Sequence, residues 1–189
     1  MVSSSVTDDV VAAARLGDTA AVTAIWRDLS PLVAGYLRAR GVEDPDGLTS
    51  DVFLSVLPRL SELRGGAAGL RTFVFSVAHA RAVDEARRRS RRPAVVEFDP
   101  TRHDSPVVSA EQEAIGRLEI ADITEQVAQL LPDHREVLAL RVVADLSLEQ
   151  TASVMGRSVG SVKQLQRRAL LALRAAVETA TAVTEGSCS

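Results

Sequence analysis

Residues 147–174 constrain this chain more than any other stretch, because they predict a short helix, a tight turn and a second helix. Ser147 and Gln150 have the spacing of a capping box, in which a side-chain hydroxyl and a side-chain amide satisfy the free backbone donors of a helix start. Gly156 predicts the end of that helix, since glycine adopts the left-handed conformation of a helix C-terminus without a Cβ clash. Ser158 is then placed to cap the second helix.

The second helix of this motif has an apolar side and a polar side. Apolar residues at spacings of three and four predict its buried stripe, namely Val162, Leu165, Ala169 and Leu173. The opposite face, at 100° per residue, carries Gly160, Lys163, Gln164, Arg167 and Arg174, flanked by Ser161 and Arg168. Residues 156–174 hold five basic residues and no Asp or Glu, whereas a merely solvated helix usually mixes acids with bases. We therefore favour contact with a DNA major groove over plain solvation.

The net charge of −3 is distributed unevenly along the chain. Residues 70–92 hold seven Arg against two acids and residues 156–174 hold five basic residues, so each stretch carries +5 and the remainder −13. Two basic islands on an acidic body predict two localised contacts with a polyanion. The acidic remainder suits equally a surface that docks on a larger enzyme and one that only keeps the protein in solution.

Composition predicts an all-helical protein and excludes several classes. Ala, Leu, Arg and Glu dominate long stretches, as in helical proteins. No run of eighteen apolar residues and no secretory signal is present, so we expect a cytoplasmic protein without membrane insertion. Cys188 is the only cysteine and cannot form an internal disulfide. Metal-ligand spacing and a nucleotide-binding glycine loop are also missing, so we expect no metal, no cofactor and no enzyme.

The helices are expected in two groups. Their approximate positions are 8–16, 18–40, 48–60 and 70–92 in the first group, and 110–131, 133–143, 148–155 and 158–176 in the second. Pro31 is expected to bend or split the second helix. Residues 63–69, with three glycines, predict a loop before the fourth. Asp133 is expected to cap the helix that follows Pro132, with Glu136 completing a capping box.

These positions predict two small helical domains. The expected division is 1–92 for the first domain, 93–112 for a proline-containing flexible linker, 113–176 for the second domain and 177–189 for a disordered tail.

The chain resembles a bacterial sigma factor of the extracytoplasmic-function type, in the sigma-70 family, over about residues 10–173. The sequence GLTSDVFLSVLPRL (47–60) is similar to the part of region 2 that docks on RNA polymerase. LRTFVFSVAHARAVDEARRR (70–89) is similar to the part that melts and recognises the minus-10 element. Residues 131–174 are similar to region 4, which recognises the minus-35 element. Many relatives have Trp where this chain has Phe73 and Asn where it has Ala80.

The resemblance implies three sets of site residues. The set for the minus-35 element is Arg157, Ser158, Ser161, Lys163, Gln164, Arg167 and Arg168. The set for the minus-10 element is Arg64, Arg71, Phe73, His79, Arg87 and Arg88. The set for polymerase binding is Asp51, Val52, Phe53 and Leu54. Arginines for phosphates and an aromatic face for an unstacked base suit single-stranded DNA, whereas Phe75 is expected to belong to the core.

The resemblance therefore implies an initiation factor that binds core RNA polymerase, duplex minus-35 DNA and single-stranded minus-10 DNA, with an anti-sigma factor as a further partner. One alternative is a self-standing helix-turn-helix regulator, which usually dimerises on palindromic half-sites. Such a regulator does not need the second basic island at residues 70–92. The other alternative is a helical adaptor without DNA affinity.

Overall fold

The protein is known from a computed structural model that describes residues 5–91, 127 and 129–186, and these residues form helices without a strand. The helices are α1 (Asp8–Arg15), α2 (Thr19–Ala39), α3 (Pro45–Val56), the 3₁₀ helix η1 (Leu57–Glu62), α4 (Ala67–Arg91), α6 (Pro132–Leu138), the π-helical turn η2 (Ala139–Val143), α7 (Leu148–Met155) and α8 (Val159–Gly186). The predicted all-helical class is confirmed. None of the described helices is long and apolar enough to cross a membrane.

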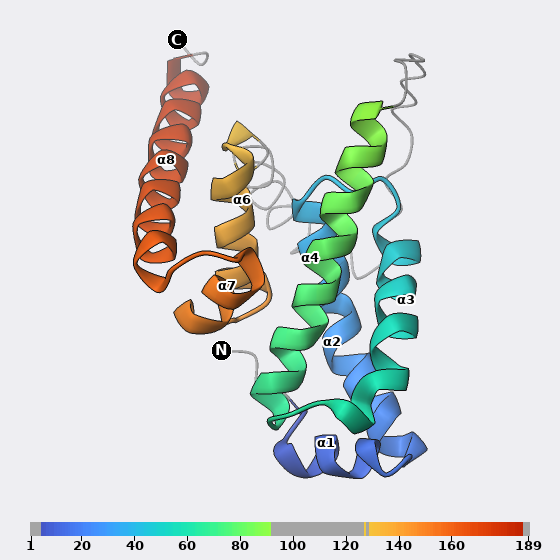
Figure 1. The fold of residues 1–189 in the computed structure, drawn as a ribbon. Coiled ribbons are helices and arrows are strands. Elements are labelled where there is room, and N and C mark those ends of the chain that lie inside the picture. Colours follow the sequence, from blue (N-terminus) through green and yellow to red (C-terminus); the bar gives the residue numbers. More distant parts are fainter. Residues whose placement is uncertain (1–4, 92–126, 128, 187–189) are drawn as a thin grey trace.

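Helices α1 to α4 form the N-terminal unit, in which α2, α3 and α4 lie side by side and α1 crosses their lower end (Figure 1). The core of this unit contains the aromatic side chains Tyr36, Phe53 and Phe75, each at most 1% exposed. The ring of Tyr36 packs edge-on against Phe75, with centroids 5.7 Å apart. Phe75 is therefore a core residue, as expected.

Helix α4 begins earlier than the sequence predicts. Its first residue is Ala67, inside the glycine-containing segment that was expected to be a loop. The carboxylate of Asp8, on α1, accepts a hydrogen bond from the Ala67 N–H at 2.7 Å and so caps α4 from another helix. The loop is thereby reduced to the residues around Gly65, whose φ of +87° needs glycine.

Helix α2 continues through Pro31 without a break. Proline inside a helix removes one hydrogen bond and costs about 3 kcal/mol or more. The residues two positions before and after it, Leu29 and Val33, are fully buried in the N-terminal unit. Packing on both sides of the proline therefore offsets the cost, and the expected split does not occur.

Helices α6, α7 and α8 form the C-terminal unit. A second apolar cluster, which includes Val137, Ala152, Val162 and Ala169, holds α6 against α7 and α8. Helix α8 extends to Gly186, so the prediction of a disordered tail from residue 177 is wrong for residues 177–186. The run after residue 176 contains Ala, Thr, Val and Glu but no proline, so nothing in it stops the helix until the glycine. The expected linker at 93–112, most of the expected helix at 110–131, and Cys188 lie outside the described residues.

The two units pack directly on each other. Leu140, Ala144, Leu146 and Val154 of the C-terminal unit belong to the same buried cluster as the core of the N-terminal unit. Helix α4 packs on α7 (Figure 1). Helix α2 packs on the π-helical turn η2. The described residues therefore form one closed body, in which one face of α4 is covered by the C-terminal unit.

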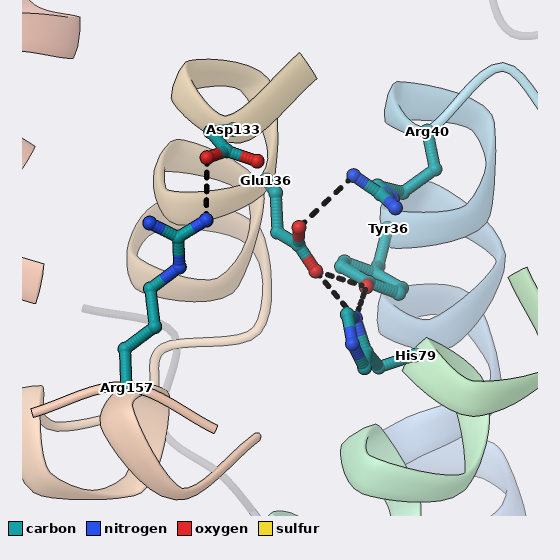
Figure 2. Close-up of polar contacts among 6 residues, drawn as sticks. All are labelled: Tyr36, Arg40, His79, Asp133, Glu136 and Arg157. Atoms are coloured by element: carbon teal, nitrogen blue, oxygen red, sulfur yellow. Dashed lines mark hydrogen bonds and ion pairs between the residues drawn. The ribbon is translucent and has the colours of Figure 1, made fainter. Parts of the chain in front are cut away.

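The predicted capping box at the start of α6 is not formed. Leu131 is at the N-cap position, and no side chain caps this helix. Asp133 instead pairs with Arg157 at the helix-turn-helix, and Glu136 points away from its own helix toward the N-terminal unit (Figure 2). The prediction is wrong because longer-range partners compete for both carboxylates, and a local sequence pattern cannot reveal them.

Candidate nucleic-acid and polymerase interfaces

The helix-turn-helix has the predicted local geometry. The Ser147 N–H donates to the side-chain carbonyl of Gln150 at 2.7 Å, and the Gln150 N–H donates to the Ser147 hydroxyl at 3.2 Å, which completes the capping box. The Ser147 hydroxyl also donates to Glu149 and lowers the pKa of that carboxyl. Gly156 ends α7 with a left-handed φ of +62°. These contacts fix the angle at which the next helix leaves the turn.

Helix α8 presents the predicted basic face to solvent. Its hydroxyl cap is formed, since the Ser161 N–H donates to Ser158 at 3.2 Å. Val162 and Ala169 are fully buried, which fixes the rotation of the helix about its axis. The side chains exposed on the other side are Ser158, Ser161, Lys163, Gln164, Arg167 and Arg168, which we call the recognition face. Four of them, from residue 163 to residue 168, line a common hollow.

Arg157 is the exception in the minus-35 set. Its guanidinium pairs with Asp133 of α6, as Figure 2 shows. The pair is partly exposed, so it ties the turn of the motif to α6 without withdrawing the arginine from solvent. Arg157 therefore positions the turn, and it is not counted in the recognition face.

The six residues of the minus-10 set are not brought together. Arg64, Arg87 and Arg88 are exposed, but they lie at opposite ends of α4, a helix roughly 38 Å long at 1.5 Å per residue. Phe73 is half-buried against the core. Arg71 donates to the Ala144 carbonyl at 3.0 Å. Arg71 is thus turned toward the C-terminal unit.

His79, the sixth residue of the minus-10 set, also faces the C-terminal unit. Its Nδ1 contacts the carboxylate of Glu136 (Figure 2). Tyr36 and Arg40 of α2 meet the same carboxylate. Burial, reinforced by the charge of Glu136, raises the pKa of the Tyr36 hydroxyl well above its ordinary range, so this hydroxyl stays a donor. Sequence analysis missed Glu136, Tyr36 and Arg40, because their meeting depends on how the two units dock.

The predicted polymerase set divides into two pairs. Asp51 and Leu54 are exposed on α3, and Leu54 is 71% exposed although it is apolar. Val52 and Phe53 are buried, and Phe53 packs edge-on against Trp26 with centroids 4.6 Å apart. Four consecutive helical residues span most of a helix circumference, so they cannot all face one partner. Val52 and Phe53 are therefore turned into the core, and a contact of these two residues with the polymerase stays a prediction.

Comparisons with known proteins agree with this arrangement. Residues 127–175 match the family model described as Sigma-70, region 4. The chain is 33% identical over 174 residues to the ECF RNA polymerase sigma factor SigD of Mycobacterium tuberculosis, covering 88% of this chain and 82% of that protein. The chain belongs to the ECF RNA polymerase sigma factors. It is also 29% identical to the ECF sigma factor ShbA of Streptomyces griseus, with 86% of this chain and 90% of that one covered.

Two solved structures share the fold. CnrH, solved in complex with the cytosolic domain of CnrY, matches with a TM-score of 0.65 at 21% identity over 91% of this chain and 97% of that one. RpoE of Bartonella quintana, solved with the anti-sigma factor NepR, matches with a TM-score of 0.64 at 16% identity, covering 83% of this chain and 96% of that one. An ECF sigma factor directs transcription initiation by RNA polymerase and is not itself an enzyme, as the sequence predicted.

Proposed function

We propose that this sigma factor contacts the minus-35 duplex through the recognition face of α8 and the opened minus-10 strand through α4. Residues 1–92 act as region 2 and residues 113–176 as region 4, joined by residues 93–112. The observation that carries this proposal is the recognition face itself, a basic surface without acids, held outward by the buried Val162 and Ala169. DNA affinity depends on neutralising phosphates with such a surface.

Within the recognition face we assign different roles by position. Lys163 and Gln164 lie in the first turns of α8, the part of a recognition helix that approaches base edges most closely. A lysine can donate to guanine, and a glutamine amide pairs in bidentate fashion with adenine. Arg168 lies further along the helix and to the flank of the face, where phosphates are the nearest groups.

In the N-terminal unit, we assign single-stranded DNA to the exposed Arg64, Arg87 and Arg88, together with Arg71, Phe73 and His79 once these are accessible. Polymerase binding is assigned to Asp51 and Leu54 on the outer face of α3. An exposed leucine beside an acidic residue is suited to docking on a surface that offers an apolar site with a basic rim. The buried neighbours Val52 and Phe53 support this surface from behind.

We also propose a place of action and a regulator. Core RNA polymerase and promoter DNA are found together in the bacterial cytoplasm, so this factor acts there. An anti-sigma factor is a further partner, because RpoE, which shares the fold, was solved in complex with the anti-sigma factor NepR. CnrH was likewise solved in complex with another protein, the cytosolic domain of CnrY.

In vitro transcription with core polymerase tests the assignment of the recognition face. Lys163→Ala and Gln164→Ala are expected to leave the fold intact, since both side chains are exposed, and to change the preferred minus-35 sequence. A base-edge contact contributes about 1–3 kcal/mol of discrimination. Unchanged preference in both variants would refute the assigned orientation of α8, and tight promoter binding by a free dimer would favour a self-standing regulator instead.

A further inference from the structure

The segment that joins η1 to α4, residues 63–66, is fixed by a side chain from a third helix. We call this segment the entry loop. In Figure 1 it runs just above α1, and α1 packs on both η1 and α4. The Asp8 carboxylate of α1 accepts a hydrogen bond from the N–H of Ala67, the first residue of α4, at 2.7 Å. A helix N-terminus has free backbone donors that attract a carboxylate, so this contact fixes the point at which α4 begins.

Glycines in and next to the entry loop allow close packing rather than free movement. A Cβ on Gly66 would collide with the Asp8 carboxylate. A Cβ on Gly69, in the first turn of α4, would lie 2.6 Å from the carbonyl oxygen of Arg64. The entry loop is therefore folded back against α4 on one side and held by Asp8 on the other.

The Asp8 side chain is not required to cap its own helix. Thr7 is the N-cap of α1, and its hydroxyl accepts a hydrogen bond from the Val10 N–H at 3.4 Å. Asp9 is also exposed in the first turn of α1, and both carboxylates complement the dipole of that helix. Of these two described acids, it is Asp8 that bonds to α4. The contact of Asp8 thus serves the entry loop and the start of α4.

The entry loop presents Arg64, an exposed member of the proposed minus-10 surface. The carbonyl group of Arg64 is pressed against Gly69, and the chain three residues later is bonded to Asp8. The backbone from which this guanidinium extends is therefore ordered before DNA arrives. A loop ordered in advance binds more tightly than a free one, because the entropy cost of ordering no longer opposes binding.

We propose that Asp8 is a positioning residue for minus-10 DNA, which holds the entry loop and Arg64 in the conformation that binds the unpaired strand. Helix α1 then contributes to promoter opening without touching DNA. The DNA part of this proposal rests on the minus-10 role of Arg64 proposed above. The other part, that Asp8 fixes the loop, concerns the free protein and is tested without DNA.

Amide hydrogen exchange in the full-length free protein tests whether Asp8 fixes the loop. Asp8→Ala removes the charged acceptor of the Ala67 N–H, so we expect exchange at Ala67 to become at least about tenfold faster. Asp8→Asn keeps a carbonyl oxygen as acceptor and is expected to retain most of the protection. Asp9→Ala is the matched control, because it removes the same charge from the same turn and should leave Ala67 unchanged. Equal exchange at Ala67 in Asp8→Ala and Asp9→Ala overturns the positioning role.

Strand opening by the holoenzyme tests the DNA part. Permanganate oxidation of unpaired thymines measures opening of the minus-10 element, in a promoter fragment selected by transcription with the wild-type factor. Ordering the backbone of about one residue changes an equilibrium constant about tenfold, so we expect a loss of this size in Asp8→Ala. Asp8→Asn should restore opening, and Asp9→Ala should leave it unchanged. Affinity for core polymerase and the minus-35 preference should be the same in all three variants, which a general folding defect would not allow.

Gly66→Ala tests the same contact from the other side and replaces Asp8→Ala if circular dichroism shows that the latter loses helix. The added Cβ displaces the Asp8 carboxylate, so we expect the same loss of opening with the aspartate still present. The double variant is expected to be no worse than either single variant, because both remove one contact. Additive losses of opening would show two independent defects and overturn the proposal.

Arg64→Ala separates this proposal from the proposed function. Loss of opening in Arg64→Ala with normal opening in Asp8→Ala overturns the positioning role. Faster exchange at Ala67 in Asp8→Ala, with normal opening in both variants, supports the fixing of the loop by Asp8 and refutes the minus-10 role proposed for Arg64.

Discussion

Two adjacent residues on α3 are expected to respond to truncation in opposite ways. Phe53 is 1% exposed and packs edge-on against Trp26, whereas Leu54 is 71% exposed. Truncating a buried Phe to Ala costs about 3–5 kcal/mol. Fully burying a Leu contributes about 1.5–3 kcal/mol, and less than a third of Leu54 is buried, so Leu54→Ala should cost about 0.5–0.9 kcal/mol at most.

Thermal unfolding measures these costs directly. For a domain of this size each kcal/mol shifts the midpoint by about 2–4 °C, so Phe53→Ala is expected to lower it by roughly 6–20 °C and Leu54→Ala by less than about 4 °C. A total stability of about 5–15 kcal/mol means that Phe53→Ala also raises the unfolded fraction enough to reduce yield. Any loss of polymerase binding by Phe53→Ala is therefore a folding defect, and only the Leu54 variant tests docking.

Binding to core polymerase is the second half of the test. If α3 docks through its outer face, Leu54→Ala removes an apolar contact at little cost to the fold, and we expect about tenfold weaker binding, equivalent to about 1.4 kcal/mol. Leu16→Ala is the matched control, because Leu16 is 90% exposed but follows α1 rather than lying on α3. Wild-type affinity of Leu54→Ala, with the fold intact, would refute the docking surface.

Four further outcomes are expected. Arg168→Ala should weaken transcription from all promoters alike and reduce the slope of log affinity against log salt by about 0.9, and a promoter-dependent loss would contradict a phosphate contact. Gly156→Ala should lower the free energy of unfolding by about 1–2 kcal/mol, because φ is +62° while the space for a Cβ is open. Gly160 lies inside α8, and a Cβ added there also meets open space. Gly160→Ala should therefore raise the free energy of unfolding by about 0.8–1 kcal/mol, which chemical denaturation can measure. Tyr36 is the only tyrosine, so tyrosinate absorption reports its ionisation alone. Burial raises its pKa in the folded state, so the contribution of Tyr36 to stability should be complete below the ordinary value near pH 10 and be lost as the pH rises above it. Half-ionised Tyr36 at pH 10 in the folded protein would contradict this.

The parts of the fold that depend on near neighbours could be predicted from the sequence. The capping box of Ser147 and Gln150, the end of α7 at Gly156 and the cap at Ser158 all involve residues three or fewer apart or a single backbone conformation. The outward rotation of α8 follows from the spacing of its apolar residues. These local signals are sufficient to define the helix-turn-helix and its basic face.

The parts that depend on docking could not be predicted in this way. Glu136 and Arg40 lie 96 residues apart, and a local pattern assigned the glutamate to a capping box instead. The start of α4 depends on Asp8, 59 residues before Ala67. The division of the polymerase set has another cause, since a resemblance identifies a run of residues, whereas helical geometry places Val52 in the core and Leu54 on the surface.

The junction between the two units combines an apolar cluster with one buried carboxylate, Glu136. An apolar residue at position 136 would pack against α2 and α4 and would resist separation in proportion to the buried area. A carboxylate held by Arg40 and His79 fixes one docking geometry through directed bonds, yet its groups are solvated well once apart. The apolar residues Leu140, Leu146 and Val154 hold the two units together, and the carboxylate adds a directed contact that selects one docking geometry.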